Sequence, residues 1–180
     1  MSHTYSEFLP SYSVGVDCYK AIPEIVKPYG KKAVAVGGKT AMEKSKKALL
    51  EGIKGSDIEI IDFVWYGGDS SYENVEKIKN NPSVQKADMV FGIGGGRAVD
   101  TAKTYCALYN KPLFTFPTIA SNCASCTSLS VMYNPDGTFK EYSYHKAPAI
   151  HTFINTKLLP NHPKSSCGQE SVTHFQRNMK

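Results

Sequence analysis

One stretch of the sequence is the most informative about the fold: Phe91-Gly92-Ile93-Gly94-Gly95-Gly96-Arg97-Ala98-Val99-Asp100-Thr101-Ala102-Lys103. Residues 89–93 form an apolar β-type run, and residues from about 98 to 109 have the pattern of a helix. Three consecutive glycines between the two remove side chains where the backbone turns sharply. A phosphate bound there would gain amide donors and the positive end of the helix dipole. The stretch predicts a phosphate-binding turn, and the alternative is a tight turn that binds nothing.

Two common phosphate-binding patterns do not fit this turn. The Walker pattern requires Gly-Lys-Ser/Thr after four free positions, and that sequence is absent here. The GxGxxG fingerprint belongs to the first strand–helix turn of its fold, whereas this cluster follows the third or fourth expected strand. A different dinucleotide-binding arrangement is therefore expected.

On both sides of this stretch, β-type runs and amphipathic segments alternate along the chain. Strands are expected at residues 32–36, 58–65, 89–93 and 113–116, with an extra strand near 12–15. Helices are expected at residues 40–53, from a cap at Ser70 or Ser71 to about residue 80, and at 98–109. This alternation predicts an α/β fold: a Rossmann-like parallel sheet with helices on both faces. The ends of its strands then meet at one edge, where ligands of such sheets bind.

The pattern changes after Ser128. Residues 129–133 and 138–144 flank the turn-rich tetrapeptide Asn134-Pro135-Asp136-Gly137, which predicts a β-hairpin. Residues 152–155 are expected to form a further strand.

Composition excludes several classes of protein. The chain has 180 residues, of which 41% are hydrophobic and 21% charged, which suits one folded domain or a little more. Its net charge of +5 is dispersed; the densest lysines, at residues 31–47, are interpreted as a solvated face, so we expect no nucleic-acid partner. No run approaches the ~20 apolar residues of a membrane span. Five irregularly spaced cysteines and an N-terminus unlike a signal peptide predict a cytoplasmic protein.

Two segments make the chain recognisable. GIGGGRAVDTAK at residues 92–103 and FPTIASNCASCTSLSVMYNPDGTFKEY at 116–142 resemble the glycerol-dehydrogenase branch of the iron-containing (group III) alcohol dehydrogenases. The resemblance covers roughly residues 8–158. It implies an N-terminal domain that binds NAD or NADP and a helical C-terminal domain that supplies most ligands of a zinc or iron ion. The implied activity is NAD(P)-dependent dehydrogenation of an alcohol, polyol or hydroxyacid, in which the metal polarises the alcohol oxygen.

The resemblance also implies individual site residues. It places the cofactor's diphosphate on Gly94, Gly95, Gly96 and Arg97. Asp100 would hold nearby amides or the nicotinamide side, and adenine or phosphate would contact Thr118 and Ser121. The nicotinamide and its ribose would lie against Thr127, Leu129 and Tyr133. Leu129 and Tyr133 also fit an alternating strand, so ordinary core packing remains the alternative for both.

The residues that follow the strand expected at 32–36 depart from the family. NAD-preferring members often carry an Asp there, which binds the adenosine ribose, whereas this chain has Gly37-Gly38-Lys39. No carboxylate at this position repels a 2′-phosphate, and Lys39 is placed to pair with one. Gly38 and Lys39 are therefore predicted cofactor contacts that allow NADP, with a solvated Lys39 as the equal alternative.

Cys123 is the second departure. Glycerol dehydrogenases carry at this position an Asp that contacts the polyol hydroxyls, and a thiol accepts such hydrogen bonds poorly. Cys123 is thus the predicted substrate contact, and a hydroxyacid, ketoacid or simpler alcohol becomes more plausible than glycerol. Cys123 and Cys126 also form a CxxC pair, for which packing is favoured over a metal or redox role. The histidines are too scattered for a metal site and are expected to pack or face solvent.

The last residues depart most from the family. We expect a dinucleotide-binding domain at residues 1–158, and a tail at 159–180 without the family's metal-binding helix. A shifted reading frame is one explanation, because back-translation of residues 166–175 permits LWAGIGDTF, a family-like segment. On this hypothesis the helical domain is absent, the uncovered face favours self-association, and the chain alone is inactive. The competing hypotheses are a non-catalytic nucleotide-binding or partner-binding module and a glycine turn without a ligand.

Overall fold

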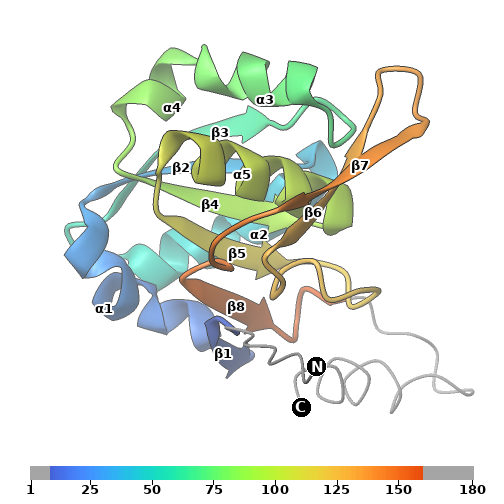
Figure 1. Cartoon of the computed structure of the whole chain (residues 1–180). Coiled ribbons are helices and arrows are strands. Elements are labelled where there is room, and N and C mark those ends of the chain that lie inside the picture. Colours follow the sequence, from blue (N-terminus) through green and yellow to red (C-terminus); the bar gives the residue numbers. More distant parts are fainter. Residues whose placement is uncertain (1–8, 160–180) are drawn as a thin grey trace, which may run out of the picture.

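Six parallel strands form one sheet, in the order β1-β8-β5-β4-β2-β3 (Figure 1). The structure is a computed structural model that describes residues 9–159. The strands are β1 Ser11–Gly15, β2 Lys32–Gly37, β3 Glu59–Trp65, β4 Met89–Gly94, β5 Leu113–Pro117 and β8 His151–Asn155. The expected parallel sheet is confirmed.

The central strands are apolar on both faces because helices cover both. Every residue of β4, β5 and β8 is buried, which explains why β4 and β5 are nearly continuous apolar runs rather than alternating ones. Phe91, Phe114, Phe116 and Phe153 from three neighbouring strands are fully buried, and the rings of Phe116 and Phe153 stack with centroids 5.0 Å apart. Packing within this aromatic layer stabilises the central strands, from whose ends the loops begin.

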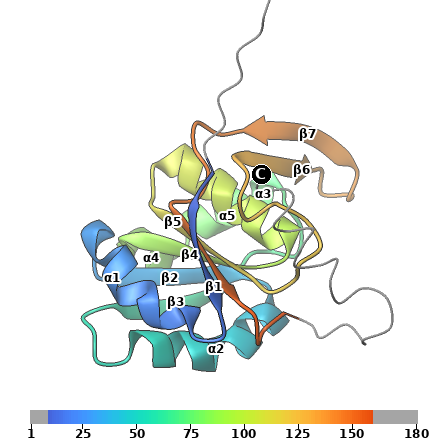
Figure 2. The same ribbon diagram turned by 90° about the horizontal axis from the view of Figure 1, so that it is seen from below.

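The helices divide between the two faces of the sheet. One face packs against η1 Cys18–Ala21, α1 Ile22–Val26, η2 Lys27–Tyr29 and α2 Lys39–Ile53. The opposite face packs against α3 Tyr72–Lys79, α4 Pro82–Lys86 and α5 Gly96–Tyr109. Figure 2 shows α1 and α2 on one side of the strands and α5 on the other.

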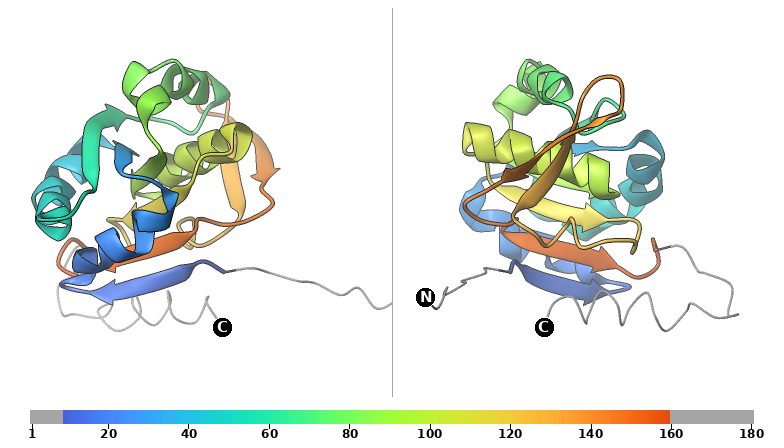
Figure 3. Two further views of the ribbon diagram at one scale, coloured as in Figure 1. Left: turned by 90° about the vertical axis from the view of Figure 1, so that its left-hand side faces the viewer. Right: turned by 45° about the vertical axis from the view of Figure 1, so that its right-hand side comes forward.

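A separate antiparallel pair, β6 Leu129–Tyr133 and β7 Phe139–Tyr144, forms the predicted hairpin. It lies beside α5 and projects beyond the sheet (Figure 3). Met132 at its base is fully buried and accepts hydrogen bonds at its sulfur from Ser70, at 3.4 Å, and from Thr104, at 3.3 Å. The hairpin is therefore fixed to the α3–α5 layer.

Strand order defines where a ligand fits. β2 and β4 are neighbours, but the chain leaves β2 through α2 toward β3, and leaves β4 through α5 toward β5. The two connections run in opposite directions and on opposite faces, so a crevice opens between the carboxyl ends of β2 and β4. In sheets of this kind, ligands bind at that crevice.

Most predicted elements are confirmed within one or two residues, with a few differences. Ser71, rather than Ser70, caps α3. The helix predicted from residue 98 begins two residues earlier, at Gly96, because Gly95 is already its N-cap. The helical segments at residues 18–29 and α4 were not predicted. The prediction for residues 160–180 lies outside the described residues. Within the described part, no helix is long and apolar enough to cross a membrane.

Candidate functional site

At the switch point between β2 and β4, two strand–helix turns approach each other closely. Gly38 N–H donates to the carbonyl of Ile93, with 3.4 Å between nitrogen and oxygen, so the turn after β2 touches the end of β4. Gly94 has φ +138°, and a Cβ there would lie 3.2 Å from the Cβ of Ala98 and 3.8 Å from the nitrogen of Gly38. Only glycine suits that combination of backbone angle and close approach. Two strand–helix turns therefore meet at the switch point.

Both helices that start at this crevice have glycine at their N-cap. Among the described residues, no side chain caps α2 at Gly38 or α5 at Gly95, and neither helix has an acidic residue in its first turn. The first N–H groups of a helix have no partner within that helix. Together with the helix dipoles, these amides create a site for an anion at each of two adjacent helix starts.

Two cations lie beside the glycine turns. The Nζ atom of Lys39 lies 4.6 Å from the ring centroid of Trp65, at the end of β3. The Arg97 guanidinium lies 4.8 Å from the ring centroid of Tyr133, in the hairpin. Burial raises the pKa of the Tyr66 hydroxyl, and Arg97 opposes that rise. The charge around the crevice therefore favours a negatively charged ligand.

The loop after β5 forms another wall. Thr118 is buried, and its N–H donates to the Gly94 carbonyl at 3.2 Å, which joins this loop to the glycine turn. Ser121 and Cys123 are exposed, whereas Cys126 is buried. A Cβ on Gly96 would lie 2.8 Å from Nδ2 of Asn122, so the Asn122 side chain covers the start of α5. The expectation that both cysteines pack is confirmed for Cys126 and wrong for Cys123.

A buried ion pair lies behind the glycine turn. Asp100 is in the second turn of α5 rather than at its start, and its carboxylate lies 2.9 Å from the Lys103 ammonium. Asp100 Oδ2 also accepts from the N–H of Val131, at 3.2 Å. Lys103 donates to the carbonyls of Thr127 and Leu129, at 3.3 Å for the first. The pair thus holds the start of β6 against α5.

Burial acts on both members of this pair. It raises the pKa of Asp100 and lowers that of Lys103, and the attraction between them opposes each shift. Both side chains are almost fully buried, at 5% and 3% exposed. The pair is held at such burial by its mutual attraction, by the main-chain carbonyls that accept from Lys103, and by the N–H of Val131 that donates to Asp100.

The histidines of the described segment make structural contacts. His151 is bonded through its two ring nitrogens to Ser11, at 2.6 Å, and to Ser13, at 2.9 Å, and so joins β1 to β8. The Nε2 atom of His145 lies 2.8 Å from the Ser130 hydroxyl. Burial and Lys103 lower the pKa of His145 to about 4. Within residues 9–159, no three His, Cys, Asp or Glu side chains gather to hold a metal ion.

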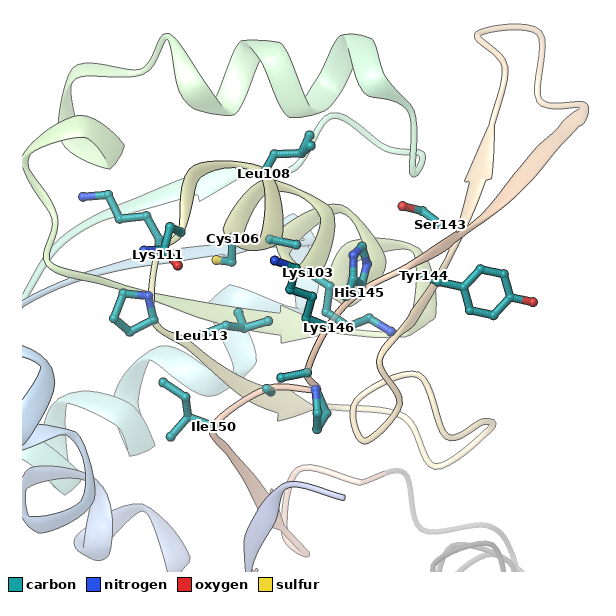
Figure 4. A pocket seen from close by; sticks show the side chains of 16 residues that line it. Lys103, Cys106, Leu108, Lys111, Leu113, Ser143, Tyr144, His145, Lys146 and Ile150 are labelled. Carbon is teal, nitrogen blue, oxygen red and sulfur yellow. The ribbon is translucent and has the colours of Figure 1, made fainter. Parts of the chain in front are cut away.

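A pocket of about 580 Å³ lies away from the crevice, between the second half of α5 and the segment that leads into β8. Figure 4 shows Lys103 and His145 entering its wall from α5 and from the segment after β7. The ammonium of Lys103 is already bonded to main-chain carbonyls, and Lys111 donates to the carbonyl of Ala87, at 2.5 Å. Both of these cations are therefore bonded to the protein's own backbone.

The predicted residues form two groups in the structure. One group lies at the carboxyl edge of the sheet: Gly38, Lys39, Gly94, Gly95, Gly96, Arg97, Thr118, Ser121 and Cys123. The other group lies along α5 and β6: Asp100, Thr127, Leu129 and Tyr133. Tyr133 connects the two through the Arg97 contact.

Three residues near the site were not predicted as contacts. Trp65 lies beneath Lys39, Asn122 covers Gly96, and Lys103 holds the start of β6. The i, i+3 spacing of Asp100 and Lys103 was a usable signal for their pairing. The contacts of Trp65 with Lys39 and of Asn122 with Gly96 join segments distant in sequence, so no local pattern predicts them.

The fold and the crevice define a doubly wound α/β domain of the dinucleotide-binding type. The family model "Iron-containing alcohol dehydrogenase" matches residues 10–154, and the chain belongs to that family. It is 26% identical over 152 residues to a glycerol dehydrogenase of Escherichia coli O6:H1, which covers 84% of this chain and 41% of that protein. It is 37% identical over 98 residues to a glycerol dehydrogenase of Thermotoga maritima, covering 54% of this chain and 27% of that protein.

A solved structure agrees with this assignment. The crystal structure of glycerol dehydrogenase from Schizosaccharomyces pombe matches with a TM-score of 0.76 and 27% identity. That match covers 88% of this chain and 40% of the other. The chain thus spans well under half the length of these relatives.

Proposed function

We propose that this chain binds NAD or NADP at the crevice between β2 and β4, as the cofactor-binding part of an alcohol, polyol or hydroxyacid dehydrogenase. The observation that carries the proposal is the pair of adjacent, uncapped helix starts at Gly38 and Gly95. The carboxyl edge of the sheet suits a long dinucleotide, because glycine turns, a buried Thr118 and two cations lie along it.

Each group at the edge has a defined task in this proposal. The amides of Gly95, Gly96 and Arg97 bind the diphosphate, and the Arg97 guanidinium adds charge. Thr118 and Ser121 flank the adenine or phosphate, while Thr127, Leu129 and Tyr133 border the nicotinamide and its ribose. A bound nicotinamide dinucleotide supplies hydride-transfer chemistry. The Asp100–Lys103 pair positions the segment on which the nicotinamide rests.

The metal of the family does not fit the described residues. No cluster of three His, Cys, Asp or Glu side chains exists in residues 9–159, so no reaction step is assigned to a metal here. We therefore propose that this chain alone does not oxidise glycerol, small diols or hydroxyacids. Turnover of any of these with zinc or iron supplied would contradict that proposal.

The choice between NAD and NADP depends on the end of β2. Lys39 begins α2 with no acidic residue in the first turn of that helix, and its ammonium lies over the exposed ring of Trp65. We propose that the chain accepts both cofactors and that Lys39 contacts the 2′-phosphate of NADP. Substitution Lys39→Gln then weakens NADPH binding several-fold more than NADH binding. Equal losses would identify Lys39 as a solvated helix-start residue.

The single tryptophan offers the test of binding. Trp65 is the only tryptophan in the sequence, and it lies next to the proposed adenosine end of the site. Reduced nicotinamide absorbs where tryptophan emits, so titration with NADH or NADPH is expected to quench Trp65 emission saturably. The reduced form of nicotinamide mononucleotide, which has the same absorbing ring but one phosphate and no adenosine, is the matched control and is expected to bind much more weakly. No saturable quenching by either dinucleotide would contradict the proposed function.

A further inference from the structure

The loop between β5 and β6 holds two cysteines in one turn. The N–H of Cys126 donates to the carbonyl of Cys123, with 2.9 Å between nitrogen and oxygen, which closes a four-residue turn. The Cα atoms at the ends of such a turn lie less than about 7 Å apart. A disulfide spans Cα atoms about 4.4–6.8 Å apart, so the backbone already matches its reach.

The two thiols differ in access. Cys123 is exposed at the rim of the crevice, whereas Cys126 is 2% exposed. Two buried hydroxyls anchor the second half of the turn: Thr115 and Thr152 both donate to the Ser125 carbonyl, at 3.0 and 3.1 Å. The Cys123 thiol is thus exposed to solvent, while the Cys126 thiol is buried in an anchored turn. An accessible thiol next to a second thiol is the arrangement typical of redox-active cysteine pairs.

We propose that Cys123 and Cys126 form a reversible intramolecular disulfide by exchange with a low-molecular-weight disulfide such as oxidised glutathione. The Cys123 thiolate attacks one sulfur of the oxidant and releases one glutathione. Cys126 then attacks the Cys123 sulfur of the mixed disulfide and releases the second glutathione. The two protein sulfurs lose two electrons, the two glutathione sulfurs gain them, and the two thiol protons end on the released glutathiones.

The difference in exposure supports the order of these steps. Burial raises the pKa of Cys126, so this thiol reacts with an external disulfide less readily than the exposed Cys123, and it attacks the neighbouring mixed disulfide through its small thiolate fraction. Cys106, by contrast, lies buried within α5, where burial raises its pKa. Cys106 therefore serves as an internal reference that stays reduced.

The test uses the full chain in a glutathione buffer with excess oxidised form, followed by alkylation of free thiols and mass mapping of peptides. We expect Cys123 and Cys126 to resist alkylation and their peptide to be lighter by two hydrogens. In Cys126→Ser, Cys123 is expected to retain bound glutathione, because no resolving thiol is present. In Cys123→Ser, Cys126 is expected to stay free. The proposal is overturned if both thiols of the unaltered chain stay alkylatable, or if Cys126→Ser carries no glutathione on Cys123.

A link to the cofactor rests additionally on the proposed function. Asn122 precedes the turn and covers Gly96, so a disulfide that fixes Cys123 also constrains the wall of the crevice. NADH affinity is expected to differ several-fold between the reduced and oxidised chains, and to be insensitive to oxidant in Cys123→Ser. Equal affinities would overturn this link, while the disulfide itself is scored separately by mass. An absence of NADH binding in both forms would contradict the proposed function instead.

Discussion

Helices α3 and α5 follow strands of the same sheet, but their N-termini are built in opposite ways. α3 is capped by its own sequence: the Ser71 hydroxyl accepts from the N–H of Asn74, at 3.4 Å, and Glu73 adds negative charge in the first turn. α5 begins at Gly95 and Gly96, with no side-chain cap and no acid in its first turn among the described residues. The first helix thus has a side-chain partner for one of its first amides, whereas no described side chain caps the second.

The same contrast extends to α4 and α2. Asn81 caps α4 by accepting from the N–H groups of Ser83, at 2.8 Å, and Val84, at 3.3 Å. Gly38 leaves α2 uncapped by any described side chain. The starts of α3 and α4 are therefore capped by side chains, whereas the starts of α2 and α5, which meet at the switch point, are not. A glycine N-cap is less stabilising than Ser or Asn by only about a few tenths of a kcal/mol, so leaving these two helix starts uncapped costs the chain little.

Removing the lysine of a buried ion pair is expected to change the free energy of unfolding more than any other substitution proposed here. The i, i+3 pair of Lys103 and Asp100 in α5 is buried, whereas the matching pair of Lys79 and Glu76 in α3 has side chains 44% and 52% exposed. Lys103→Met leaves Asp100 buried without its partner and should lower the free energy of unfolding by about 3–5 kcal/mol. Lys79→Met is the matched control and should shift the urea midpoint far less. Equal midpoints for the two variants would contradict the structural role of Lys103.

Closing α5 with a side chain gives the next largest effect. Gly95 already has N-cap geometry, at φ −88° and ψ −174°, so Gly95→Asp should cap the helix and repel a diphosphate. We expect NADH binding to weaken at least about a hundredfold, equivalent to about 2.7 kcal/mol, while the apo chain becomes slightly more stable. Calorimetric titration and urea unfolding measure the two changes. Gly95→Ser separates capping from charge, and unchanged affinity in both variants would break the comparison.

Removal of the α3 cap should have a smaller effect of a different kind. Ser71→Ala removes the acceptor for the N–H of Asn74, and the free energy of unfolding should fall by about 1 kcal/mol. NADH affinity should change far less than in Gly95→Asp, because the Ser71 hydroxyl is bonded to the N–H of Asn74 within its own helix. A loss of affinity comparable to that of Gly95→Asp would show that the two helix starts act alike.

Acid should loosen the contact between the hairpin and α5. The pKa of His145 is lowered to about 4 in the fold, from an ordinary value of 6.5, so the unfolded chain binds more protons between these values. The contribution of His145 to stability is therefore present above pH 6.5 and is lost as pH falls toward 4. Urea midpoints at several pH values measure this loss. His145→Gln should flatten the slope in that window, and an unchanged slope would contradict the assignment.

Local patterns predicted most of the fold. The apolar runs of β2, β4 and β5 could come only from strands covered on both faces, and Asn134-Pro135-Asp136-Gly137 marked the hairpin turn. α4 was missed because Asn81-Pro82 was interpreted as the end of α3, whereas Pro82 is the first residue of a new helix capped by Asn81. The helical turns at residues 18–29 are too short to show a periodic apolar pattern.

The candidate site was less accessible to prediction. The glycine cluster alone predicted the phosphate-binding turn. The approach of Gly38 to Gly94, however, depends on the pairing of β2 with β4. Local sequence patterns do not predict strand order. The resemblance supplied the residue list. The burial of Lys103 against Thr127 and Leu129 depends on how the hairpin docks, which is a long-range property.

The most direct test of the open helix starts is a map of backbone amide shifts, recorded by NMR on the full chain as NADH is added. The account predicts the largest shifts at Gly38 and Lys39 and at Gly95, Gly96 and Arg97, with the capped starts of α3 and α4 unchanged. Shifts that cluster instead on α3, on α4 or around the pocket at the end of α5 would contradict it.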